Sequence, residues 1–79
     1  MYQYYVVEIK ENTIGEFEHQ TYWLWDESEK KAELKGEAKY HEIMATAAIS
    51  EYPHHSAILF SSEATPIMFG HYDHTTEAE

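Results

Sequence analysis

Alternating apolar and polar positions mark the first third of the chain. Residues 2–10 and 16–25 are rich in aromatic and β-branched residues that alternate with polar ones, a pattern typical of β-strands. Asn12 and Gly15 lie between them and accept positive φ angles, which predicts a turn and therefore a hairpin. On the second strand the alternation places one set of residues on one side, namely Phe17, His19, Thr21, Trp23 and Trp25.

A three- and four-residue spacing of apolar positions follows the hairpin and predicts one helix. The pattern is clearest over residues 38–50, and Asp26 or Ser28 provides the N-cap. Gly36 interrupts the helix and predicts a kink or a close contact there. We expect Pro53 to end the helix.

A second hairpin completes the predicted fold. Residues 56–61 and 67–72 form short apolar runs on either side of a loop that contains Pro66. The order β-β-α-β-β predicts an α+β fold, a four-stranded antiparallel sheet with one helix packed on one face. Residues 1–74 are expected to form a single domain, and residues 75–79 a mobile acidic tail.

The sheet faces carry more apolar side chains than one helix can cover. Tyr4 and Val6 alternate with Tyr5 and Val7, so both sides of the first strand are apolar or aromatic. The face away from the helix is therefore expected to expose a patch that monomers rarely leave bare. The small size of the chain adds to this argument, and we expect a homodimer through the sheet face or an edge strand. The alternative is that both tryptophans point at the helix and the other face tolerates water.

The charge excludes several classes of partner. Fifteen acidic residues oppose five lysines and no arginine, for a net charge of -10. Direct binding to nucleic acid requires a cationic surface, and anionic membranes repel an acidic one. No segment approaches the ~20 apolar residues of a membrane span, and the N-terminus lacks a signal-peptide pattern. Together with the absence of cysteine, these features lead us to expect a cytoplasmic protein.

Catalytic and cofactor signatures are absent from the sequence. There is no cysteine, no Gly-x-Ser-x-Gly elbow and no glycine-rich phosphate loop, so we expect neither an enzyme nor a cofactor. His41-Glu42 begins like a zinc-protease helix, but Ala45 stands where the second histidine belongs. Six histidines offer a weaker metal hypothesis, whose candidates are His55, His71 and His74.

Aromatic anchors and carboxylates suggest a binding surface instead. Exposed aromatic side chains commonly dominate binding energy, and carboxylates steer a protein toward a basic partner. Glu8, Glu16 and Glu18 on adjacent strands could begin a row of negative charge. The expected partner-binding residues are Tyr2, Tyr4, Glu8, Glu16, Glu18, Trp23 and Trp25.

In size, acidity, lack of cysteine and order of elements, the chain resembles the small phage-encoded anti-CRISPR proteins. That resemblance implies a non-enzymatic inhibitor that blocks a basic, nucleic-acid-binding surface of a bacterial protein complex. It carries no shared motif, so it assigns no residue. The alternatives are a homodimeric structural or interaction module with no inhibitory role, and a histidine-based metal-binding regulator.

Overall fold

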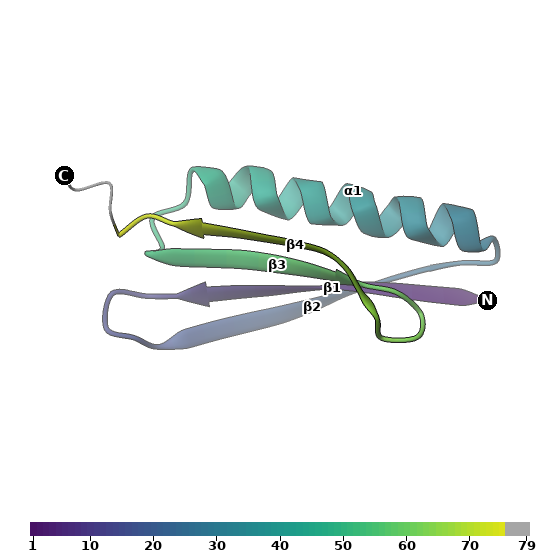
Figure 1. Cartoon of the computed structure of the whole chain (residues 1–79), viewed down its shortest axis with the longest axis horizontal. Coiled ribbons are helices and arrows are strands. Elements are labelled where there is room, and N and C mark those ends of the chain that lie inside the picture. Colours follow the sequence, from purple (N-terminus) through teal and green to yellow (C-terminus); the bar gives the residue numbers. More distant parts are fainter. Residues whose placement is uncertain (76–79) are drawn as a thin grey trace.

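The computed structural model describes residues 1–75, and it confirms the α+β fold expected from the sequence. A four-stranded antiparallel sheet carries one helix along one of its faces, and no described element covers the other face (Figure 1). The elements are β1 (Tyr2–Glu11), β2 (Phe17–Asp26), α1 (Glu29–Ala48), β3 (His54–Phe60) and β4 (Pro66–Asp73).

The two hairpins meet in the middle of the sheet, whose strand order is β2-β1-β3-β4. β1 and β3 are therefore the central strands, although the whole helix separates them along the chain. Tyr5 pairs with Trp23 on one side and with Phe60 on the other. In the first turn Gly15 has a φ of 84°, as expected, whereas Asn12 acts through its side chain, whose Oδ1 accepts the Glu16 N–H at 2.9 Å.

Helix α1 begins at one of the two caps that the sequence offered. The Ser28 side chain accepts the Lys31 N–H at 3.3 Å, and Asp26 accepts the Ser28 N–H at 2.9 Å, so the two candidates act in series. The helix ends at Ala48 rather than at Pro53, because Ile49 leaves helical geometry and donates its N–H to Thr46. Pro53 instead lies just before β3.

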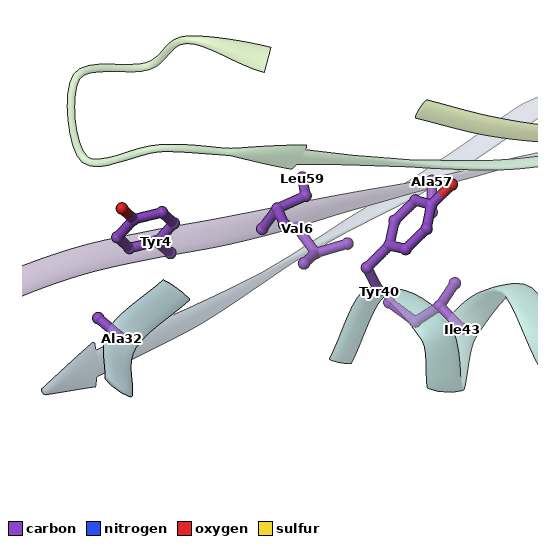
Figure 2. Packing of buried hydrophobic residues seen from close by; sticks show 7 residues of the cluster. All are labelled: Tyr4, Val6, Ala32, Tyr40, Ile43, Ala57 and Leu59. Atoms are coloured by element: carbon purple, nitrogen blue, oxygen red, sulfur yellow. The ribbon is translucent and has the colours of Figure 1, made fainter. Parts of the chain in front are cut away.

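The core lies between α1 and one face of the sheet, where the side chains shown in Figure 2 point toward one another. Gly36 explains how the helix approaches so closely: a Cβ there would lie 2.8 Å from Leu59 Cδ1 and 3.3 Å from Tyr4 Cβ. The interruption at Gly36 is thus a close contact. The core cluster consists of Tyr4, Val6, Ala32, Tyr40, Ile43, Ala57 and Leu59.

The described part of the chain ends beyond β4 with a short turn. His74 donates its backbone N–H to Pro53 O at 2.7 Å, and Thr75 donates its N–H to Asp73 at 2.9 Å. The remaining residues of the expected mobile tail, 76–79, lie outside the described part of the chain. Within residues 1–75, α1 is not apolar enough to cross a membrane.

Candidate protein-binding surface

The face of the sheet opposite α1 gathers most of the large apolar side chains that the core does not use. The register of the strands brings these side chains into rows that cross the sheet. We call this surface the open face. It consists of the outward-pointing residues Gln3, Tyr5, Val7, Ile9, Glu11, Phe17, His19, Thr21, Trp23, Trp25, His54, Ser56, Ile58, Phe60, Phe69, His71 and Asp73.

One row of the open face consists of three aromatic rings from three adjacent strands. The Tyr5 ring lies between Trp23 and Phe60, with ring centroids 4.8 Å and 4.9 Å away respectively. We call this row the aromatic ridge. Its rings contact one another, so they are held in place before any partner binds, which reduces the entropy that binding costs.

Smaller side chains form the next row of the same face. Thr21, Val7 and Ile58 pair across β2, β1 and β3, and Phe69 continues the row on β4. We call the first three the β-branched row. Branching at Cβ leaves these side chains few rotamers, so their part of the surface is also fixed.

Several rings of the open face are strongly exposed, whereas Tyr5 and Phe60 in the aromatic ridge are half-buried. Trp23 and Trp25 are 48% and 49% exposed, and Phe69 is 64% exposed. A single exposed aromatic residue needs no explanation, but a contiguous patch that spans four strands is typical of an interface. Alternation placed both tryptophans on one face of β2 without telling which face α1 covers. The structure places them away from the helix, so the alternative in which they face α1 is wrong.

Polar groups occupy one end of the open face. His54 Nδ1 lies 3.3 Å from His71 Nε2, and the two rings stack. The carboxylates of Glu11 and Asp73 lie 4.0 Å and 3.9 Å from His54. These are the carboxylates of the open face within residues 1–75, so the aromatic ridge and the β-branched row carry no charge.

Two of the expected binding residues lie beneath the helix. Tyr4 is 5% exposed and Glu8 is 6% exposed, so neither is available to a partner in the folded chain. Alternation separates Tyr4 from Tyr5 but does not tell which of them the helix covers. Tyr5, on the opposite side, is the ring that reaches the open face.

Glu8 belongs to a buried hydrogen-bonded network. Tyr22 donates to Glu8 Oε1 at 2.9 Å, and His55 Nε2 donates to Glu8 Oε2 at 2.6 Å. Burial opposes ionisation of this carboxyl and is the largest single influence on it. The hydrogen bonds from His55 and Tyr22, aided by the charges of Lys10 and His55, outweigh burial and lower the pKa of Glu8.

The same network continues to a hydroxyl, since His55 Nδ1 lies 2.9 Å from Ser50 Oγ. A serine, a histidine and a carboxylate in series also occur in hydrolases. Here Ser50 follows the C-terminal end of α1, whose partial negative charge opposes negative charge on a substrate oxygen. We therefore interpret the network as structural: it ties the end of α1 to β1 and β3.

Three further expected binding residues, Tyr2, Glu16 and Glu18, do not lie on the open face. Tyr2 is exposed near the start of β1, and Glu16 lies in the first turn, where Asn12 Nδ2 donates to it at 3.2 Å. Glu18 lies opposite Lys10 in the register of β1 and β2, on the helix side of the sheet. A row of carboxylates through Glu8 and Glu18 is thus excluded, because Glu8 is buried.

The histidine candidates for a metal site are separated. His55 is buried on the helix side of β3, whereas His71 lies opposite Ser56 and faces the open side. His74 Nε2 donates to Ala47 O at 2.9 Å. His55 and His71 therefore cannot share a metal ion, and no group of three or more potential ligands converges within residues 1–75.

Several open-face residues were missed in the sequence, above all Tyr5, Phe60 and Phe69. The signal that could have found them is the alternation of side chains along each strand. Once Trp23 is placed on the face away from α1, the strand register places Tyr5 and Phe60 beside it on the same face. No protein-family model matches the chain, and no curated protein or solved structure is significantly similar to it.

Proposed function

We propose that the chain is a non-enzymatic protein-binding domain that contacts its partner through the open face. The observation that carries this proposal is the uncharged, solvent-exposed aromatic surface on the side of the sheet that α1 leaves bare. Burying such a surface is favourable by about 25 cal/mol per Å² of apolar area. Tryptophan and tyrosine are also the residues most often responsible for binding energy in interfaces.

The test compares two substitutions of equal chemistry on opposite sides of the molecule. Trp23 on the open face and Leu34 on the outer side of α1 are both 48% exposed. Trp23→Glu and Leu34→Glu each replace an apolar side chain by a carboxylate, and circular dichroism verifies that both variants fold. We expect Trp23→Glu to abolish protein binding in pull-down and analytical centrifugation experiments, and Leu34→Glu to retain it.

A second proposal assigns a role to the carboxylates outside the open face, and it keeps the inhibitory function expected from the charge. Burial raises the pKa of Tyr4, and the carboxylates of Glu29, Glu33 and Glu37 raise it further. Three acids on one side of α1 thus act on a single hydroxyl. The same turns of α1 also carry Lys30, Lys31 and Lys35, so the basic surface of a nucleic-acid-binding complex, as for an anti-CRISPR-like inhibitor, would have to meet this stripe of three carboxylates rather than the helix as a whole.

This second proposal predicts binding that weakens as salt increases. Pull-downs from bacterial lysate at low and moderate salt compare the wild type with a triple variant in which Glu29, Glu33 and Glu37 become glutamine. The matched control removes three charges elsewhere, at Glu16, Glu18 and Glu63. Loss of a nucleic-acid-binding complex in the first variant alone supports the acidic inhibitor, and equal capture by both variants contradicts it.

A further inference from the structure

We infer that the occupant of the open face is a second copy of this chain, packed face to face about a twofold axis. This inference rests on the proposed binding role of the open face. Neither the aromatic ridge nor the β-branched row carries a charged side chain, whereas the chain as a whole has a net charge of -10. A basic partner has no carboxylate to meet on these rows, but a second uncharged apolar surface does fit them.

The arrangement of side chains makes this surface complementary to itself. The aromatic ridge and the β-branched row are adjacent and cross the same strands. A twofold axis that runs between the two rows, parallel to them, places the ridge of each copy over the β-branched row of the other. Large rings then pack against short side chains, and each of these contacts occurs twice, as in the isologous contact of a twofold dimer.

The same axis also resolves the electrostatics of pairing two acidic chains. Glu11 and Asp73 lie in the same row of the open face, three rows away from the aromatic ridge. The axis leaves this row outside the overlap of the two sheets. No carboxylate of one copy then faces a carboxylate of the other, and the remaining repulsion between the copies is long-range and screened by salt.

The area of the sheet sets the size of such an interface. Strands that average about nine residues, at ~3.3 Å per residue, and four strands at ~4.8 Å spacing give a face of roughly 550 Å². Full overlap of two such faces would bury about 1,100 Å², and leaving the row of Glu11 and Asp73 outside the overlap reduces this to roughly 900 Å², the size of a small and weak interface. A second copy would also provide the sheet with the second layer that a single helix cannot supply.

The decisive experiment is sedimentation equilibrium of the full chain over a range of concentrations, with three variants. We expect a wild-type dimer. We expect Trp23→Glu to weaken dimerisation about tenfold or more, and Leu34→Glu to leave it unchanged. Thr21→Trp enlarges the apolar surface but fills the β-branched row where the ridge of the partner packs, so it should also weaken the dimer. Circular dichroism verifies that each variant folds.

Each other outcome overturns the inference in a recognisable way. A dimer that Thr21→Trp strengthens shows nonspecific apolar association, and a dimer indifferent to Trp23→Glu shows pairing through a surface other than the open face, such as an edge strand. A wild-type monomer that still captures another protein in a Trp23-dependent manner contradicts the dimer but supports the proposed function. A monomer that captures nothing contradicts both.

Discussion

The buried carboxylate of Glu8 is the residue whose ionisation most clearly contributes to stability. Its lowered pKa means that the folded state favours the ionised form, through the hydrogen bonds from His55 and Tyr22. This stabilisation is fully present above the unfolded-state pKa of about 4.3 and is lost as the pH falls through the folded-state pKa. Acidification below about pH 4 should therefore weaken the fold through this site.

Replacement of Glu8 by glutamine tests this assignment. We expect Glu8→Gln to lower the free energy of unfolding at pH 7 by about 1–3 kcal/mol, because His55 loses its ionised partner. The gap between wild type and variant should narrow as the pH falls below about 4, where the wild-type carboxyl also becomes neutral. Urea unfolding across this pH range measures the gap, and exposed Glu16→Gln is the control. A gap independent of pH contradicts the role of ionisation.

At the scale of elements, Gly36 determines how closely α1 lies on the sheet. An alanine there gains about 1 kcal/mol in helix propensity but places a methyl group against the buried Leu59 side chain and Tyr4 Cβ. Overpacking typically costs 1–3 kcal/mol, so we expect Gly36→Ala to be destabilising by roughly 1 kcal/mol overall. Thermal unfolding measures this, and stabilisation by Gly36→Ala would show that the helix shifts freely on the sheet.

The elements also show what the sequence could and could not predict. Alternation in β2 placed Trp23 and Trp25 on one face, and the residue types at the helix start narrowed the N-cap to Asp26 or Ser28, because both are local effects. The strand order and the burial of Tyr4 and Glu8 depend on where α1 packs, and β1 is apolar on both faces. The helix end was placed too far along the chain, because no glycine marks the C-cap at Ile49.

For the whole molecule, the net charge of -10 opposes compactness. Salt screens this repulsion, so raising sodium chloride from about 20 to 300 mM at pH 7 should increase stability by about 1 kcal/mol, or roughly 4–8 °C in Tm. Calorimetry at one protein concentration measures the change. Near the isoelectric point of about 4.8 the effect should vanish, which is the control. A Tm that falls with salt at pH 7 would mean that pairs such as Lys35–Asp26 outweigh the repulsion.

The position of β1 and β3 in the middle of the sheet also determines how the chain folds. Each hairpin joins neighbouring segments and can form within microseconds, but a lone hairpin is only marginally stable in water. The pairing of β1 with β3 must close a loop that contains β2 and all of α1. We therefore expect the closure of this loop, rather than the formation of either hairpin, to limit folding. Until β1 and β3 pair, the edges of both strands are open to pairing with other chains.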